Sequence, residues 1–161
     1  MIKKHKNNDF VVNLEWCFED TESIHFYFIQ ELHPGNLQQY LRKYTQISET
    51  KCRFYAAQIL LGLKFFHSLN IPYRHLTSLN VLKRQNGYVC LTDFGMQRIL
   101  KLAEKRPSHF FGNVEYVSPE VNSGVYQTME DDFWSLGVVI YEMIVGITPF
   151  YDEDPLRILE L

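Results

Sequence analysis

The 161-residue sequence has little cysteine, no long apolar run and no strong excess of charge of either sign. Its three cysteines, Cys17, Cys52 and Cys90, form no C-x-x-C pair, so their spacing speaks against a zinc site and favours a reduced protein. The net charge of −3 is slightly negative, so the sequence lacks the excess of positive charge that is typical of proteins that bind nucleic acid or a membrane surface. The longest apolar stretch, residues 133–147, contains polar residues and is too short to cross a bilayer. With no signal-peptide pattern at the start, the sequence predicts a cytoplasmic (intracellular) protein without nucleic-acid binding or a transmembrane segment.

Apolar and aromatic residues are plentiful enough to build one folded domain with a core. Residues 10–17 and 24–30 are rich in Val, Phe, Tyr and Ile, and the polar residues 19–23 separate them. This pattern predicts a β-hairpin at the beginning of the chain.

Helical patterns dominate the rest of the sequence. A helical period begins at Leu37, and Ser48 is a candidate N-cap for a long helix that runs to about His67. Apolar residues cover most of that helix, which predicts burial on more than one side. A second apolar helix is expected over residues 133–145, with Gly146 as its C-cap.

Two short segments between the helices carry turn and loop signals. Asn-Gly at residues 86–87 lies between the apolar pairs 81–82 and 88–89, which predicts a tight hairpin. The polar and basic character of residues 97–108 predicts a surface loop.

Three motifs follow one another in a fixed order: Tyr-Arg-His-Leu-Thr-Ser-Leu-Asn at residues 73–80, Asp-Phe-Gly at 93–95 and Ser-Pro-Glu at 118–120. Magnesium prefers a few carboxylate or amide oxygens and keeps phosphate and water as its other ligands. Asn80 and Asp93 provide such oxygens, and the predicted hairpin between them would bring them together. The motifs therefore point to a magnesium site beside a phosphate.

The motifs resemble the catalytic loop, the magnesium loop and the end of the activation segment of a protein kinase. Residues 54–57 (Phe-Tyr-Ala-Ala), 134–138 (Trp-Ser-Leu-Gly-Val) and 141–146 (Tyr-Glu-Met-Ile-Val-Gly) resemble the protein kinase C branch of the AGC-type serine/threonine kinases. The resemblance implies an α+β, protein-kinase-like fold that is partial and forms a single domain. Residues 10–32 would be the end of the small lobe and the hinge, and residues 33–161 a mostly helical large lobe without its last helices.

The resemblance also implies ATP and Mg²⁺ as cofactors. The residues it places around the nucleotide are Glu31 and His33 in the hinge beside adenine, Leu82 under the base, and Asn36 near the ribose. Asn80 and Asp93 would hold magnesium. Asp132 would brace the catalytic loop or, equally, cap the helix that follows it, and Glu142 would face a basic substrate side chain.

Two positions depart from the family pattern. His75 stands where a kinase has the aspartate that orients the substrate hydroxyl, and an imidazole differs from a carboxylate in shape and reach. Thr77 stands where a kinase has a lysine, so the positive charge that stabilises the transferring phosphate is lost. Both positions are therefore interpreted as degenerate. The sequence before Phe10 also contains no Gly-rich loop and no V-A-I-K lysine.

The expected function is that of a protein serine/threonine kinase family domain, whose family transfers the γ-phosphate of ATP to protein. This chain is expected to be a catalytically impaired pseudokinase or a fragment. Two alternatives stay open: a non-catalytic regulatory module that docks kinase partners, and an active kinase of which this sequence is a part. The expected partner is a protein substrate or a kinase-pathway protein, and the oligomeric state is left open. Exposed apolar surface on the hairpin predicts poor solubility.

Overall fold

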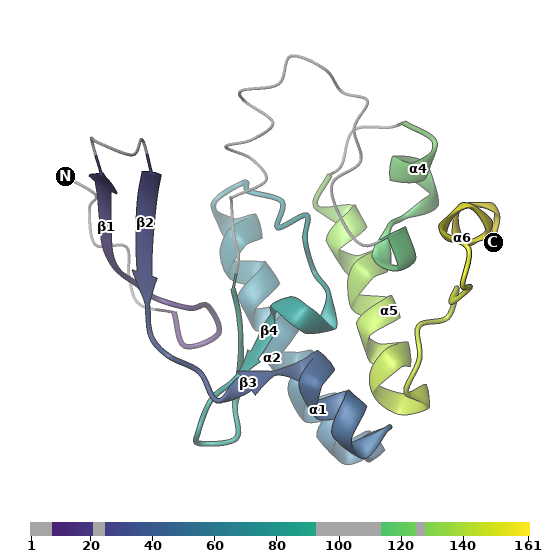
Figure 1. The fold of residues 1–161 in the computed structure, drawn as a ribbon, viewed down its shortest axis with the longest axis horizontal. Helices are drawn as coiled ribbons and strands as arrows, with labels where there is room; N and C mark the ends of the chain where they lie inside the picture. Colours follow the sequence, from purple (N-terminus) through teal and green to yellow (C-terminus); the bar gives the residue numbers. More distant parts are fainter. Residues whose placement is uncertain (1–7, 21–24, 93–113, 125–127) are drawn as a thin grey trace.

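The structure is a computed structural model that describes residues 8–20, 25–92, 114–124 and 128–161. Figure 1 shows a two-stranded hairpin standing beside a body made of helices and a small second sheet. This mixture of antiparallel strands and helices confirms the expected α+β class. Asp93, Ile24 and the predicted loop 97–108 lie outside the described residues.

The hairpin consists of β1 (Leu14–Asp20) and β2 (His25–Gln30), paired antiparallel. It begins later than the sequence predicted because the preceding residues pair elsewhere. The Val12 N–H donates to the Leu91 carbonyl oxygen at 2.9 Å, and the Leu91 N–H donates to the Phe10 carbonyl oxygen at 2.9 Å. Residues 10–12 thus extend the second sheet, and only the later residues form the hairpin.

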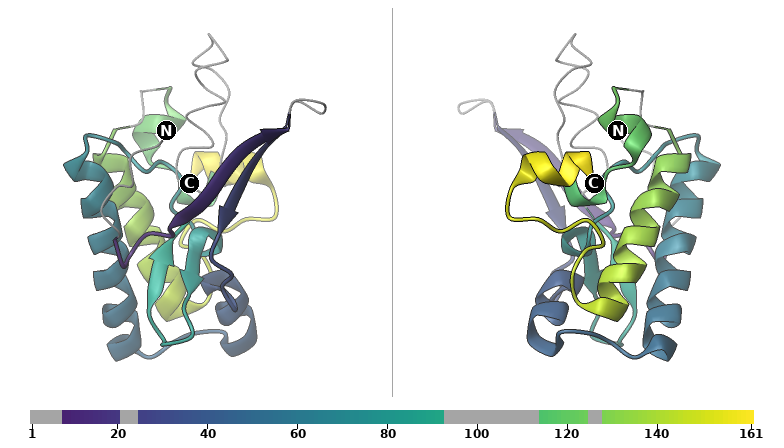
Figure 2. Two further views of the ribbon diagram at one scale, coloured as in Figure 1. Left: turned by 90° about the vertical axis from the view of Figure 1, so that its left-hand side faces the viewer. Right: turned by 90° about the vertical axis from the view of Figure 1, so that its right-hand side faces the viewer.

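Apolar side chains lie exposed on both faces of the hairpin. Trp16, which pairs with Ile29, is 73% exposed, and Phe18 stacks on its cross-strand partner Tyr27 with ring centroids 5.0 Å apart. The opposite face carries Phe26, which is 62% exposed. Figure 2 shows the hairpin projecting away from the helices that bury the core.

The second sheet has the order β3-β4-β5, with every pair antiparallel: β3 (Gly35–Asn36), β4 (Val81–Lys83) and β5 (Val89–Leu91). A tight turn joins β4 to β5, and Gly87 has a φ of 85° there, which suits glycine. The hairpin predicted from Asn-Gly is therefore confirmed.

Helix α1 (Leu37–Tyr44) begins at a reciprocal cap. The Asn36 side-chain oxygen accepts from the Gln39 N–H at 2.8 Å, and the Asn36 N–H donates to Gln39 Oε1 at 3.2 Å. This capping box satisfies two of the backbone donors that a helix start leaves open.

Helix α2 (Glu49–Ser68) follows Ser48, as the sequence predicted. Its buried side chains form a single stripe: Cys52, Tyr55, Gln58, Ile59, Leu63 and Phe66. The prediction of burial on more than one side is wrong, because Phe54, Leu60 and Leu61 are each 43–44% exposed. The apolar composition of α2 led to too large an estimate of its buried surface, because the helix contacts its neighbours along one side only.

Helix α5 (Glu130–Val145) packs against α2, and Figure 2 shows the two lying side by side. It begins three residues earlier than predicted, where Asp131 accepts a hydrogen bond from the Thr128 N–H at 2.6 Å. It ends at Gly146, with φ 94°, as predicted. The core gathers side chains from both main helices, from the second sheet, from α1 and from the loop before η1: Leu37, Ile59, Leu63, Leu76, Val81, Val89, Leu91, Val139 and Met143.

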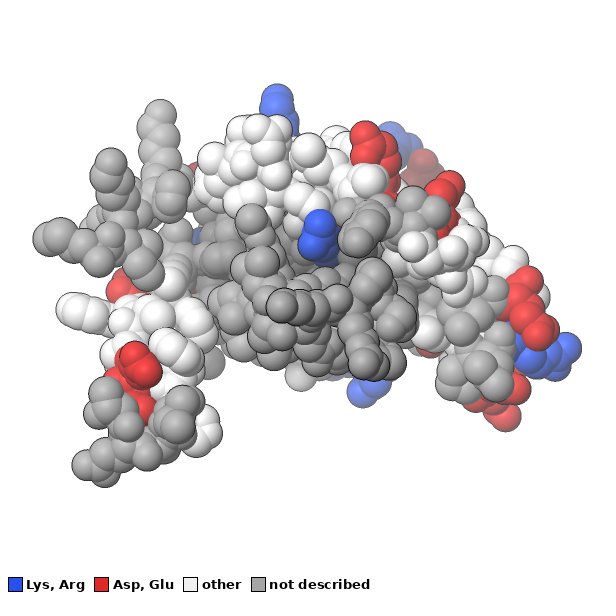
Figure 3. Space-filling model, turned by 90° about the horizontal axis from the view of Figure 1, so that it is seen from above, with Lys and Arg blue, Asp and Glu red and all other residues white. Residues whose placement is uncertain are grey.

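The remaining described elements are short: η1 (Ser78–Asn80), η2 (Val114–Tyr116), α4 (Pro119–Asn122) and α6 (Pro155–Glu160). None of the described helices combines the length and apolar character needed to span a bilayer. Seen from above, the described Lys and Arg side chains are scattered singly rather than gathered in a patch (Figure 3).

Candidate kinase-like catalytic site

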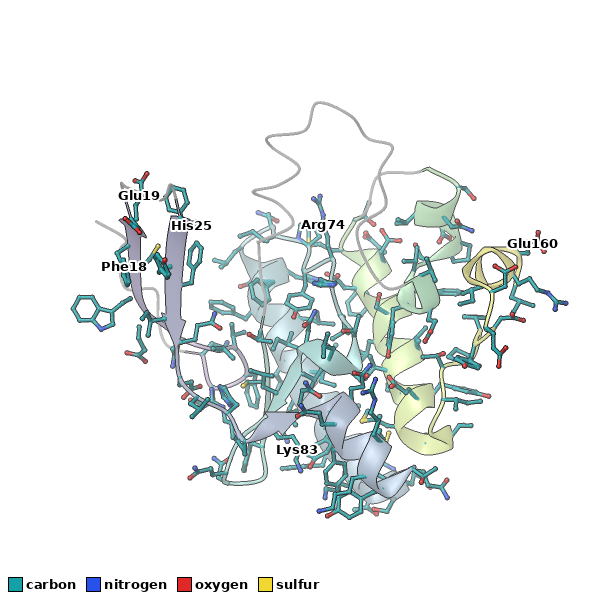
Figure 4. The ribbon with its side chains drawn as sticks, viewed as in Figure 1. Phe18, Glu19, His25, Arg74, Lys83 and Glu160 are labelled. Atoms are coloured by element: carbon teal, nitrogen blue, oxygen red, sulfur yellow. The ribbon has the colours of Figure 1, made fainter. Side chains whose placement is uncertain are left out.

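A loop formed by residues 73–80 runs from the end of α2 to β4, and Asp132 of α5 holds its first two residues. Asp132 Oδ2 accepts from the Tyr73 N–H at 2.8 Å, and Asp132 Oδ1 accepts from the Arg74 N–H at 2.7 Å. The carboxylate is 1% exposed, so these hydrogen bonds satisfy a charge that would otherwise be buried at high cost. Arg74, labelled in Figure 4, has a φ of 69°, a left-handed conformation that this anchoring supports.

His67 of α2 adds a third contact to the same carboxylate. Its Nε2 lies 2.7 Å from Asp132 Oδ2. The sequence alone gives no signal for this contact. The two residues are 65 positions apart, and only the packing of α2 on α5 brings them together.

His75 and Asn80 lie at the centre of the loop. Asn80 Nδ2 donates to the His75 backbone carbonyl oxygen at 3.0 Å and contacts His75 Nδ1 at 3.0 Å. A carbonyl oxygen can only accept, so it fixes the NH₂ end of the amide toward His75. His75 Nδ1 must then also accept, and the neutral ring carries its proton on Nε2.

The same geometry bears on the predicted magnesium ligands. Because Nδ2 of Asn80 faces His75, its Oδ1 is the atom that could serve a cation, and carboxamide oxygen suits Mg²⁺. The Thr92 N–H donates to the Asn80 carbonyl oxygen at 3.0 Å, so the residue before Asp93 lies beside Asn80. Asp93 itself lies outside the described residues. Of the two expected magnesium ligands, the structure therefore describes Asn80, whose position fits that role.

Thr77 lies at the position of the expected lysine and is 6% exposed. Its hydroxyl Oγ1 is buried and makes no hydrogen bond to the residues that the structure describes. A hydroxyl at this place can donate one hydrogen bond but brings no positive charge.

A buried polar cluster, missed by the sequence interpretation, joins the loop to α5 and η2. Ser78 Oγ donates to Glu142 Oε1 at 2.8 Å, and the Tyr116 hydroxyl donates to Glu142 Oε2 at 2.6 Å. Burial is the main cause that raises the pKa of Glu142, while the hydrogen bonds from Tyr116 and Ser78 oppose the rise. Burial also raises the pKa of Tyr116. Glu142 is 7% exposed with both oxygens in use, so it does not face outward as expected for a substrate-binding residue.

The expected hinge residues lie between β2 and β3. Glu31 Oε1 is 3.0 Å from Arg84 Nη2 and 3.3 Å from His33 Nε2. His33 Nε2 in turn lies 4.0 Å from the Cys90 sulfur on β5. The side chains of Glu31 and His33 thus turn toward the second sheet, which leaves their backbone groups as the candidates for an adenine contact.

The other two expected nucleotide residues lie on β3 and β4. Asn36 pairs with Leu82 across these strands, but its side-chain oxygen is already used to cap α1. Leu82 is half-buried between Asn36 and Cys90. Lys83, the next residue on β4 and labelled in Figure 4, turns toward α1, where its ammonium lies 3.7 Å from the centre of the Tyr40 ring.

These features are those of a protein kinase domain. A family model described as "Protein kinase domain" matches residues 1–160, and the chain belongs to that family. The described fold and the spacing of the loop, β4 and α5 agree with a partial kinase domain.

Similar curated proteins point to the AGC-type serine/threonine kinases. The chain is 37% identical over 159 residues to "cAMP-dependent protein kinase catalytic subunit 3" of Drosophila melanogaster, covering 99% of the chain and 27% of the relative. It is 36% identical to human "Protein kinase C delta type", covering 95% of the chain and 22% of the relative. It is 39% identical to Caenorhabditis elegans "Serine/threonine-protein kinase sgk-1", covering 90% and 31%. The chain therefore spans less than a third of the length of these relatives.

Proposed function

We propose that this chain is a degenerate AGC-type kinase domain, which keeps the scaffold of a nucleotide and magnesium site and has lost efficient phosphoryl transfer to serine or threonine. The observation that carries the proposal is the contact between Asn80 and His75. This contact supports a neutral imidazole with its proton on Nε2, which would make that nitrogen a donor. A substrate hydroxyl needs an acceptor there.

The proposed cofactors are ATP and Mg²⁺, held by Asn80, Asp93, Leu82 and the backbone of Glu31 and His33. Bound ATP would supply the phosphoryl group, and Mg²⁺ would offset its charge. The carboxamide of Asn80 is buried and oriented by His75, which supports its role as a ligand. Asp132 fixes the backbone of the loop on which Asn80 lies.

Thr77 supports the loss of transfer independently of His75. Phosphoryl transfer depends on cationic groups around the phosphate, and removing one stabilising donor costs about 100-fold or more. The uncharged Thr77 hydroxyl replaces such a group. Two changed side chains on an intact loop thus support a binding function without turnover.

A second candidate function is a docking module for a kinase-pathway protein. It is supported by the apolar hairpin, whose Trp16, Phe18 and Phe26 are more than half exposed. In this proposal residues 10–32 form the end of a small lobe with the hinge, and residues 33–161 form the large lobe.

The proposed location is the cytoplasm. Cys17, Cys52 and Cys90 are all free thiols, which supports a cytoplasmic location.

The proposal is tested by separating binding from transfer. Binding is measured as a thermal shift with ATP and Mg²⁺, in the unchanged chain and in the Asn80→Ala and Asp93→Ala variants. Transfer is measured with radiolabelled ATP and a basic peptide. We expect a shift that both substitutions remove, together with no transfer above background. Robust transfer that disappears in His75→Ala would overturn the proposal, and the absence of any nucleotide-dependent shift would favour the docking module.

A further inference from the structure

Three side chains with different metal-binding atoms meet where the hinge approaches the second sheet. Glu31 and His33 belong to the segment between β2 and β3, and Cys90 lies in the middle of β5. Their ligand atoms all lie within 4.8 Å of one another. The His33 side chain is 6% exposed, Cys90 is 2% exposed and the Glu31 Oε1 atom is buried as well, so all three ligand groups are largely withdrawn from solvent.

We propose that Glu31, His33 and Cys90 form a binding site for one Zn²⁺ ion, with water as the fourth ligand. In a tetrahedral zinc site the bond lengths give an N···O edge of about 3.4 Å and an S···N edge of about 3.6 Å. The corresponding separations here are 3.3 Å for His33 Nε2 to Glu31 Oε1 and 4.0 Å for His33 Nε2 to Cys90 Sγ. All three ligand atoms lie within 4.8 Å of one another, which is longer than a tetrahedral edge, so the Cys90 and Glu31 side chains must close in on the ion when it binds.

The ligand set favours a borderline transition ion over magnesium or calcium. Thiolate and imidazole select Zn²⁺ and its neighbours, whereas the hard cations prefer oxygen ligands alone. On binding, the S–H bond of Cys90 breaks, a zinc–sulfur bond forms, and the proton passes to solvent. The metal stays divalent, so no oxidant or reductant takes part.

Arg84 is the neighbour that an incoming ion would meet. Its Nη2 lies 3.0 Å from Glu31 Oε1. This is the same oxygen that lies 3.3 Å from His33 Nε2, so the Glu31 carboxylate must turn on metal binding, offering one oxygen to the ion while the other takes over the contact with Arg84, as outer hydrogen-bonding groups do in metal sites. The thiolate and the carboxylate together cancel the charge of Zn²⁺, which leaves Arg84 beside a neutral centre.

Such an ion would tie the hinge to β5. His33 and Cys90 are 57 residues apart, so their bridge would join the segment that follows the hairpin to the sheet under the loop. It uses side chains only and leaves the backbone of Glu31 and His33 available. The site is therefore independent of nucleotide binding.

The test uses the complete chain with Cys17→Ser, because Cys17 is an exposed thiol that could bind metal by itself. Cobalt(II) is the probe, since thiolate coordination gives it a charge-transfer absorption band and tetrahedral geometry gives strong visible bands. Zinc affinity follows from competition against bound cobalt. The substitutions are Cys90→Ser and His33→Gln, and Cys52→Ser is the matched control because Cys52 is also a buried thiol. Circular dichroism establishes that each variant is folded.

We expect one cobalt ion per chain with a thiolate band that zinc displaces. Cys90→Ser removes the band, and His33→Gln weakens binding by more than about 100-fold, which exceeds the loss caused by changing an outer-shell group. Cys52→Ser leaves both unchanged. Should Cys90→Ser fail to fold, His33→Gln carries the test. Octahedral cobalt spectra, a band that survives in Cys90→Ser, or affinity unchanged by His33→Gln would overturn the proposal.

Discussion

The carboxamide of Asn80 donates to both the backbone carbonyl oxygen and the ring Nδ1 of His75, each at 3.0 Å. One side chain thereby sets the protonation pattern of another five residues away. The arrangement leaves Asn80 Oδ1 free of His75, and a neutral imidazole that accepts at Nδ1 carries its proton on Nε2.

The first prediction concerns that proton. In long-range proton–nitrogen NMR spectra at neutral pH, neutral His75 is expected as the Nε2–H tautomer, because Nδ1 accepts from Asn80. Asn80→Leu removes the donor with similar volume, and the Nδ1–H tautomer should then become populated. A dominant Nδ1–H form in the unchanged chain would contradict the geometry. His25, exposed on β2, is the internal control.

Two glycines in the main helices predict opposite stability changes. A Cβ on Gly62 of α2 would lie 2.8 Å from the Phe10 carbonyl oxygen and 2.9 Å from Leu91 Cδ1. We expect Gly62→Ala to destabilise the fold by about 1–3 kcal/mol, as overpacking does. A Cβ on Gly137 of α5 meets nothing within 4 Å among the described atoms, so Gly137→Ala should stabilise by about 1 kcal/mol. Urea unfolding of both variants tests the pair, and equal signs would refute it.

Glu142 predicts a pH dependence of stability. Its pKa in the fold lies above the ordinary value of 4.5, chiefly because it is buried. The stability contributed by the protonated carboxyl is therefore fully present below pH 4.5 and is lost as pH rises through the raised pKa. Glu142→Gln imitates the neutral form, so the variant should gain stability relative to the unchanged chain as pH rises from 4.5. Urea midpoints across this range measure the difference, and a difference independent of pH would be the contrary result.

The contact between Lys83 and Tyr40 predicts an energetic coupling. Burial lowers the pKa of Lys83, so its charge needs compensation, and the ring of Tyr40 supplies it at 3.7 Å. A double-mutant cycle with Lys83→Met and Tyr40→Leu should give a coupling of about 0.5–1 kcal/mol. Lys51 also approaches this ring, at 4.6 Å, so a parallel cycle with Lys51→Met serves as the comparison. Additive effects in the first cycle would exclude a cation–π contribution.

The hairpin predicts self-association of the isolated chain. Trp16 is 73% exposed and Phe26 is 62% exposed, on opposite faces of a two-stranded sheet. Replacing both with lysine should increase the monomer fraction in sedimentation at the same concentration, because the apolar contact area is lost. Leu69→Lys, at an exposed helix end, controls for the added charge. A monodisperse, cooperatively melting monomer without any substitution would contradict the expectation of poor solubility.

Local patterns predicted much of the fold because local physics decides those features. Gly146 ends α5 and the turn at residues 86–87 joins β4 to β5, as cap and turn chemistry require. Ser48 stands at the N-cap position of α2 as predicted, but its side chain makes no capping hydrogen bond. The start of the hairpin was misplaced because residues 10–12 pair with β5, a partner that no local pattern reveals.

The candidate site was predictable in its residue types and less so in its contacts. The order of the motifs located His75, Thr77 and Asn80 on one loop. The contact between His67 and Asp132 and the cluster of Ser78, Tyr116 and Glu142 depend on tertiary packing, so sequence spacing held no signal for them. The group of Glu31, His33 and Cys90 was missed for the same reason. Cys90 lies on β5, far from the other two in the sequence, so a search for closely spaced metal ligands does not find it.

Asp132 accepts hydrogen bonds from two backbone N–H groups of the loop formed by residues 73–80. These two N–H groups are present whatever side chains follow, so the anchor at Asp132 does not depend on the identity of residues 75 and 77. Chemistry and architecture are thus separable in this domain. The double variant His75→Asp and Thr77→Lys would change the side chains while the backbone contacts of Asp132 remain. The chain is therefore suited to measuring how much phosphoryl transfer these two side chains can restore.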